Sequence, residues 1–468
     1  MYLTTLRRVD GAPHALTLLV LSLSVLVAQV DTAVVNLGVR PIASAFAAPV
    51  GEMQWLIDAY NLAYAVVLLT GGLLADLHGR RRIFMIGAAL FTLASLACTF
   101  APSVAVLIAG RAVAGVGAAL MIPASLAILR VVWLDPGERA RALGVWAACY
   151  GLAMAVGPTL GGVLITAFGW RSIFLMVVPL SLGALLLARP VIPESADPEG
   201  RAFDFPAQLA GAVALGGVAF AAIEAHVAPV GAVAALLVAA LAFAAFGRIE
   251  ARQGAAALVP LDLLRIPPFR GAAAATGGMT FGMYGVLFVL PLFWQASGRL
   301  GPVGVGVAMV PLALAFLVVS LGSGHFAGRL GTRFMTGGGV GIIAAGVLII
   351  GFGAGALAPA VIGLALTGLG MGLATGPLTG VAVGAVGPAR SGTASSLINV
   401  VRMAGATLGV AAMGTVFAAA GGGTAGLVLA MLVGGTVQLA GALTAWRTID
   451  GEAVGHQGAG RVSPRSPR

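Results

Sequence analysis

Charged residues are scarce in this chain, and lysine is absent. Charged residues make up 9% of the sequence, whereas a typical soluble globular protein has about 25%. Hydrophobic residues make up 59%, and the mean hydropathy is +1.04. A soluble core cannot bury this much apolar surface in 468 residues. The composition therefore excludes an ordinary soluble protein and predicts an all-α integral membrane protein.

The missing lysines leave 26 arginines to supply all the basic side chains, and the net charge is +10. A nucleic-acid-binding protein would gather such residues on one soluble face. Here they occupy short gaps between apolar runs, so we expect lipid and no nucleic acid as the partner. Cysteine is also rare. Cys98 and Cys149 lie in apolar runs without metal-ligand spacing, so we expect two buried small residues and no metal site.

Long hydrophilic segments are missing too. The longest gaps between apolar runs, 190–205 and 247–271, are too short for a soluble catalytic or nucleotide-binding domain. The sequence contains no G-x-x-x-x-G-K-[ST] phosphate loop. We therefore expect no enzymatic activity, no cofactor and no use of ATP, which leaves an ion gradient as the energy source.

Apolar runs of about 20 residues predict membrane-spanning helices. We count fourteen, although Glu224, His226 and Pro229 interrupt the seventh and eighth. The first run is too long for a signal peptide and contains Asp31, so we interpret it as a retained span. The predicted spans are 14–36, 55–75, 83–101, 104–131, 141–166, 171–189, 206–225, 229–246, 272–294, 302–322, 336–355, 358–383, 394–418 and 424–446.

The arginines predict the orientation in the cell membrane. With both termini cytoplasmic, Arg40, Arg171 and Arg299 fall outside and Arg111 falls within a span. The other 22 of the 26 arginines then fall inside, as the positive-inside rule requires.

Two loops reveal an internal repeat. Residues 72–82 and 324–333 have similar sequences, and each follows the second span of a six-span set if spans seven and eight are an insertion. Two related halves around a midplane site are a recurrent transporter plan. The predicted domains are an N-terminal six-helix bundle (1–190), a linker with two extra spans (191–270), a C-terminal six-helix bundle (271–448) and a disordered tail (449–468).

Three motifs follow one another in the first half of the chain. They comprise a loop signature (Gly72, Asp76, Gly79, Arg80, Arg81), a span-four set (Arg111, Gly115, Gly117) and a span-five run (Gly157, Pro158, Thr159, Leu160, Gly161, Gly162). In this order and spacing the chain resembles the major facilitator superfamily, in particular its fourteen-span drug/proton antiporter branch. Val177 and Met403 depart from that branch, where Asn and Gln are usual. Four further segments of the chain also resemble this branch. They are Asp31-Thr32…Asn36, Trp55…Tyr60, Trp170-Arg171…Phe174…Pro179 and Gly392…Ala394-Ser395…Asn399…Arg402…Gly405.

Three ionisable residues within predicted spans, where a charge is costly, are our candidates for function. Asp31 lies deep in the first span. It either accepts a proton or contacts a cationic substrate, or else it only makes a hydrogen bond between helices. Arg111 needs a carboxylate or carbonyl partner, and Asp31 is our candidate. Such a pair would either take part in transport or be purely structural. Asp58 shares a helix face with Asn61. It either couples protons or stabilises the start of its helix near the outer interface.

Two motifs predict moving parts. Asp76 would contact the helix start near Thr393 in one of two states and act as a latch, while Arg80–Arg82 would pair with Asp135 or Glu138. A topology signal alone is the alternative. Pro158 kinks span five, and its glycines, Gly157, Gly161 and Gly162, admit a close neighbour from the other half, as a hinge or seal or as plain packing.

Soft and aromatic side chains in span nine suit poorly specific apolar ligands, although a lipid-facing stripe is the alternative. The complete set of cavity candidates is Asn36, Tyr60, Asn61, Met279, Met283 and Tyr284.

The resemblance implies a proton-coupled exporter of small amphipathic drugs that confers antibiotic resistance, with the seventh and eighth spans outside the moving core. A proton-coupled importer of a nutrient or metabolite is the alternative on the same scaffold. A membrane enzyme or scaffold is the third possibility, but its loops would need a catalytic cluster that the sequence does not contain.

Overall fold

The computed structural model describes residues 14–196, 205–225, 228–253, 261–386 and 391–449. Within these ranges the regular structure is helical, and no strand occurs. The helices are α1 (His14–Phe46), α2 (Val50–His78), α3 (Arg80–Thr99), α4 (Val104–Val132), α5 (Pro136–Phe168), α6 (Ser172–Val191), α7 (Phe205–Glu224), α8 (Pro229–Gln253), η2 (Leu261–Arg265), α9 (Pro267–Ala296), α10 (Pro302–Arg333), η3 (Phe334–Gly338), α11 (Gly339–Phe352), α12 (Leu357–Gly384), α13 (Ser391–Ala419) and α14 (Thr424–Thr448).

Most of these helices could cross a membrane. Twelve described helices are long and apolar enough, and α2, which is bent by 50° between Leu68 and Thr70, would make thirteen. In α5 the apolar segment found is the shorter Val156–Phe168. The chain is thus a multi-pass membrane protein, while the count of fourteen spans stays a prediction. The tail predicted to be disordered falls outside the described residues from 450 onward.

Several helices extend well beyond the predicted apolar runs. The first was predicted to end at residue 36, but α1 continues to Phe46. Polar residues do not end a helix whose hydrogen bonds are all local, so apolar length underestimates helix length. Arg402 lies within the predicted span 394–418 although we counted it with the inner arginines, and the structure places it three turns inside α13.

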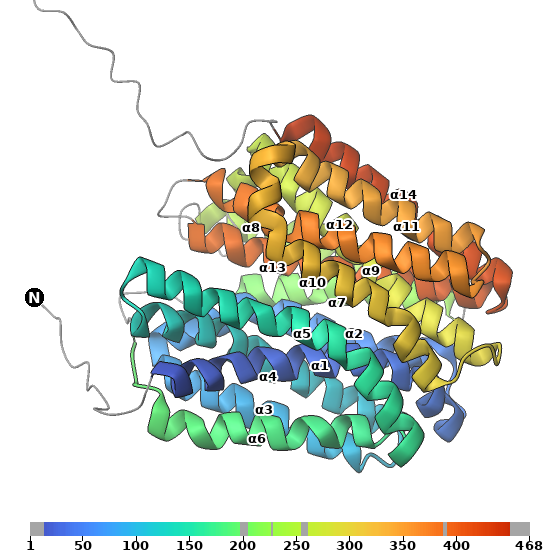
Figure 1. Ribbon diagram of the computed structural model, residues 1–468, viewed down its shortest axis with the longest axis horizontal. Helices are drawn as coiled ribbons and strands as arrows, with labels where there is room; N and C mark the ends of the chain where they lie inside the picture. The colour runs from blue at the N-terminus through green and yellow to red at the C-terminus, as the bar shows by residue number, and fades with distance from the viewer. Residues whose placement is uncertain (1–13, 197–204, 226–227, 254–260, 387–390, 450–468) are drawn as a thin grey trace, which may run out of the picture.

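The helices pack in two groups, α1–α6 and α9–α14 (Figure 1). We name them the N-terminal group and the C-terminal group. The main contacts between the groups join α5 to α10 and α2 to α13. We call the end with Arg80 the arginine-rich end, and the end where α1 turns into α2 the far end. That these groups are pseudo-symmetric six-helix domains remains a prediction.

The internal repeat has a structural counterpart at the arginine-rich end. Gly79 between α2 and α3 has φ +103°, and Gly331 near the end of α10 has φ +75°. Two residues after each glycine an arginine donates to the carbonyl that ends the last helix of its group. Arg81 Nη1 lies 3.1 Å from Ile192 O, and Arg333 Nε lies 3.1 Å from Ile449 O.

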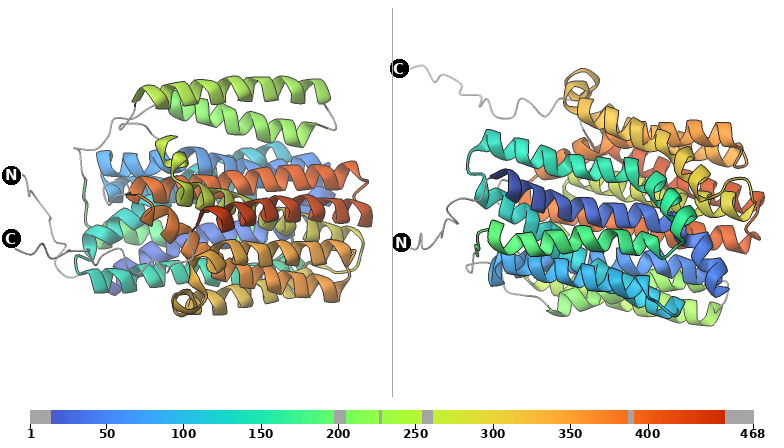
Figure 2. Two further views of the ribbon diagram at one scale, coloured as in Figure 1. Left: turned by 90° about the horizontal axis from the view of Figure 1, so that it is seen from above. Right: turned by 60° about the horizontal axis from the view of Figure 1, so that its bottom comes forward.

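The α7–α8 hairpin lies along one side of the molecule, with α8 outermost (Figure 2, left, green). Helix α8 packs chiefly on α7, whereas α7 contacts both α2 and α13. We expected this pair to stand outside the core. The pair lies beside the two groups (Figure 2), and α7 touches both of them, so its place relative to a moving core stays a prediction.

Candidate functional site

The centre of the N-terminal group holds a buried ion pair. Asp31 of α1 accepts a hydrogen bond through Oδ2 from Arg111 Nη1 of α4. The side chains are 1% and 2% exposed, so the pair is enclosed by protein. Asp31 Oδ1 has no hydrogen-bond partner among the described residues. The expected pairing is therefore present, with one carboxylate oxygen uncommitted.

Arg111 also contacts α2. Its Nε donates to Leu56 O at 3.3 Å. Its guanidinium lies over the ring of Tyr60, 4.5 Å from the centroid, and Tyr60 stacks on Tyr64. A planar guanidinium can make all these contacts at once. Arg111 thus joins α1, α2 and α4.

Close packing of α2 against α4 makes these contacts possible. A Cβ on Gly115 would lie 3.1 Å from Tyr60 Cα and would collide with the Tyr60 carbonyl oxygen. A glycine here lets the backbones approach, as is usual at membrane helix interfaces. Because Gly115 is one turn from Arg111, the same contact sets the height of the Tyr60 ring.

Asp58 is a second buried carboxylate, in the third turn of α2. It is fully buried, and neither oxygen has a hydrogen-bond partner among the described residues. The amide nitrogen of Asn61, one turn on, is also without one. The interfacial alternative for Asp58 is wrong, because α2 begins at Val50 and the residue lies deeper than the predicted start at residue 55 implied.

The remaining cavity candidates are also buried. Asn36 Nδ2 donates to Thr32 O of its own helix at 2.9 Å. Met279 and Met283 are each 2% exposed, and Tyr284 is buried as well. The lipid-facing alternative for this part of α9 is therefore wrong. Met279 Sδ lies 4.0 Å from Thr375 Oγ1 of α12.

The loop motif is anchored differently from our expectation. Asp76 pairs with Arg80 at 2.7 Å, and Arg81 pairs with Glu194 at 3.6 Å. Arg80 N also donates to Ser195 O at 2.8 Å. The segment after α6 thus lies against this loop. Residues 387–390 and the Thr393 side chain are outside the described part of the chain, so the proposed latch remains a prediction.

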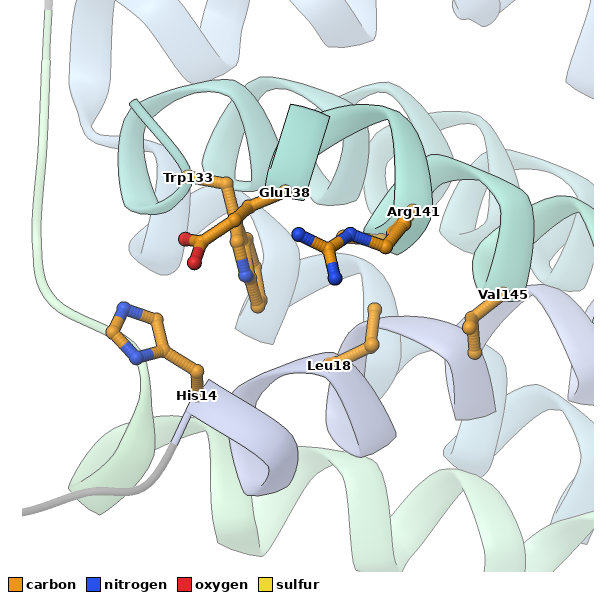
Figure 3. Close-up of a pocket in the computed structure, with 7 residues that line it drawn as sticks. His14, Leu18, Trp133, Glu138, Arg141 and Val145 are labelled. Atoms are coloured by element: carbon orange, nitrogen blue, oxygen red, sulfur yellow. The ribbon is translucent and has the colours of Figure 1, made fainter. Parts of the chain in front are cut away.

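The predicted pairing of Arg80–Arg82 with Asp135 or Glu138 is wrong for the first two of these arginines. Asp135 instead caps α5 and accepts from Glu138 N at 2.8 Å. The Glu138 side chain and Arg141 point into a hollow between α1 and α5 (Figure 3). Asp135 is used as a helix cap, and the path of the chain after α6 decides the partner of Arg81. The spacing of charged residues along the sequence shows neither.

That hollow is distinct from the ion pair. His14 and Trp133 lie on its rim, with ring centroids 5.5 Å apart. Asp31 is 17 residues beyond His14 in α1, or about 25 Å along the helix. The hollow belongs to the arginine-rich end, where aromatic and charged side chains are typical of a membrane interface.

The span-five glycines divide between two neighbours. A Cβ on Gly162 would lie 2.6 Å from Pro302 O of α10, in the other group. A Cβ on Gly161 would contact Val34 of α1, in its own group, and Gly157 faces Ala33 there. Pro158 lies inside α5, and its carbonyl approaches Gly306 of α10. The expected contact with the other half is therefore made by only part of this motif.

Uncharged amides that sequence analysis did not select also join the groups. Gln54 Nε2 of α2 donates to Ala411 O of α13 at 2.8 Å. Gln295 Nε2 of α9 donates to Leu37 O of α1 at 3.2 Å. Both lie near the far end. Each glutamine lies one residue outside a predicted span, 55–75 or 272–294, so the predicted span boundaries concealed their burial.

These features define a class: a multi-pass membrane transporter with two contacting helix groups and a buried ion pair. The Major Facilitator Superfamily model matches residues 21–410. The chain belongs to the major facilitator superfamily.

Relatives in the family include named resistance and efflux proteins. "Multidrug resistance protein Stp" of Mycobacterium tuberculosis is 35% identical over 78% of this chain and 68% of its own length. "Methylenomycin A resistance protein" of Bacillus subtilis is 35% identical over 68% of each chain. "Multidrug efflux pump LfrA" of Mycolicibacterium smegmatis is 31% identical over 71% of this chain and 66% of its own.

Solved structures show the same fold. A bacterial homologue of the human lysosomal transporter Spinster, inward-facing and unoccupied, has a TM-score of 0.62 and 18% identity over 93% of this chain and 95% of its own. The POT family transporter PepTSo has a TM-score of 0.67 and 13% identity over 93% of this chain and 99% of its own.

Proposed function

We propose that the chain is a proton-coupled exporter of small amphipathic drugs in the cell membrane, with both termini cytoplasmic. The relatives named as multidrug resistance and efflux proteins support export. Alternating access would rock the two helix groups against each other. The far end, joined through Gln54 and Gln295, would face outside and be closed in this state.

The Asp31–Arg111 pair is the observation on which proton coupling depends. Protonation of Asp31 would neutralise one member and leave the Arg111 charge buried without a counterion. Breaking a buried pair in this way costs about 3–5 kcal/mol. Arg111 would then have to move relative to Leu56 and Tyr60, which would transmit the event from α4 to α2.

Asp58 is the second protonation candidate. Its carboxylate is fully buried and has no hydrogen-bond partner among the described residues, so a negative charge there is costly. Its proton could be exchanged when the far end opens, because α2 is one of the helices that form the contact between groups. An inward proton supplies about 2.3 kcal/mol per 100 mV, and that free energy would drive the export step.

Transport assays in membrane vesicles test the proposal. Inverted vesicles should accumulate an amphipathic cationic dye when a proton gradient is imposed, and dye addition should partly dissipate that gradient. Asp31→Asn should abolish both effects, whereas Glu52→Gln, which removes an exposed carboxylate of α2, should keep both. Dye movement that is unaffected by collapse of the gradient would contradict proton coupling. Gradient-driven uptake into right-side-out vesicles would indicate the importer instead.

A further inference from the structure

Helix α7 is attached to α2 along its length. At the arginine-rich end Thr70 Oγ1 donates to Gln208 Oε1 at 2.6 Å. Near the far end the rings of Trp55 and Phe220 have centroids 6.2 Å apart. Because contacts at both ends of α7 involve α2, the two helices should move as one body.

At the far end α7 also reaches the C-terminal group. Thr415 Oγ1 of α13 donates to Ala222 O of α7 at 2.6 Å. The same hydroxyl accepts from Gln54 Nε2 of α2 at 3.3 Å. The three groups form a short hydrogen-bond chain from α2 through α13 to α7, and such chains strengthen each member.

This chain of contacts lies at the far end, where α2 of the N-terminal group meets α13 of the C-terminal group. Gln54 is 1% exposed, so its amide needs the α13 partners that it has. When the two groups separate here, the Ala222 carbonyl loses its donor, because α7 stays with α2 while Thr415 leaves with α13. The α7–α13 bond therefore exists only while the far end is closed.

We propose that α7 is a brace that stabilises the far-end-closed state, and that Thr415 is the positioning residue through which it acts. The inference rests on the proposed rocking of the two groups. It assigns the inserted hairpin a role in the conformational equilibrium rather than in substrate binding. The Thr70–Gln208 bond, which lies within the moving body, should not affect that equilibrium.

Three variants separate these roles. Thr415→Val removes the hydroxyl and keeps the shape of the side chain, while Thr415→Ser keeps the hydroxyl. Thr70→Val removes the matched hydroxyl that bonds α7 to α2. Thr415→Val removes both the bond to Ala222 O and the longer bond from Gln54 Nε2, so the ratio of far-end-open to far-end-closed molecules should rise by at least about fivefold. The ratio should change by less than about twofold in the other two variants.

Distances between spin labels report this ratio in the full-length protein in lipid nanodiscs, with Cys98 and Cys149 replaced by alanine. A label pair at Phe168 and Leu357 spans the far end, and a pair at Leu134 and Leu330 spans the arginine-rich end; all four side chains are exposed. In Thr415→Val the first distance should lengthen and the second should shorten.

Each other outcome has a definite meaning. An unchanged ratio in Thr415→Val, or an equal shift in Thr415→Ser, would overturn the role of the hydroxyl. An equal shift in Thr70→Val would overturn the claim that α7 moves with α2. If the wild-type protein itself shows no far-end-open population with dye at any pH, alternating access fails, and the brace fails with it. A wild type that alternates while Thr415→Val is silent removes the brace alone.

Discussion

Arg111 contacts two other helices of the N-terminal group. Its guanidinium binds Asp31 of α1 and the Leu56 carbonyl of α2, and it covers the Tyr60 ring. A buried guanidinium with three kinds of partner is costly to disturb and costly to leave uncompensated. Stability and transport should therefore respond differently when the pair is removed in parts or as a whole.

Asp31→Asn should lower the free energy of unfolding by about 3–5 kcal/mol, because Arg111 then remains charged and without a counterion. The double variant Asp31→Asn/Arg111→Gln should recover most of that loss, since no buried charge remains, yet should not transport. Thermal unfolding in detergent and dye transport in vesicles measure the two properties. A double variant that transports at the wild-type rate would show that the pair is structural only.

The sequence was sufficient to predict the Asp31–Arg111 pair, because a charge in an apolar run must find its opposite. It was not sufficient for Asp58, whose depth depended on where α2 begins. Glu194 was missed because it lies outside the apolar runs. Its approach to Arg81 depends on the path of the chain after α6, and spacing along the sequence does not determine that path.

At the scale of elements, the turn from α2 to α3 and its counterpart at the end of α10 depend on glycine. Gly79 and Gly331 have positive φ angles, which residues with a Cβ adopt only with strain. Alanine at either position should lower the free energy of unfolding by about 1 kcal/mol. Gly183→Ala, in a helix with open space around the new methyl group, should be neutral or slightly stabilising. Thermal melts of the three variants check the sign.

Two adjacent glycines of α5 pack against different partners near the crossing with α10. Gly161 faces its own group, and Gly162 faces the other group. Gly162→Ala would push α10 away, because its methyl group would lie against the Pro302 carbonyl. We expect a shift toward the far-end-open state, measured by the Phe168–Leu357 label distance. Gly161→Ala would press on Val34 within the same group and should lower stability without changing that distance. Equal shifts in both variants would contradict this division.

At the scale of the whole molecule, the helical class and the order of the helices followed from the apolar runs. The position of α7 did not. Its sequence is apolar over most of its length, so it does not reveal which face meets α2 and which meets lipid. The contacts at Thr70, Trp55 and Thr415 help to fix that position, and each involves a partner far away in the sequence.

The distribution of arginines makes a final prediction about the whole molecule. Arg40, Arg171 and Arg299 belong to the far end, whereas most of the 26 arginines belong to the other end. Because loops rich in arginine stay in the cytoplasm, this distribution places the far end outside the cell. Single cysteines at Phe168 or Leu357 should react with a membrane-impermeant thiol reagent in intact cells. Cysteines at Leu134 or Leu330 should react only after the cells are opened. The reverse pattern would invert the topology, and the direction of transport proposed for each vesicle preparation would invert with it.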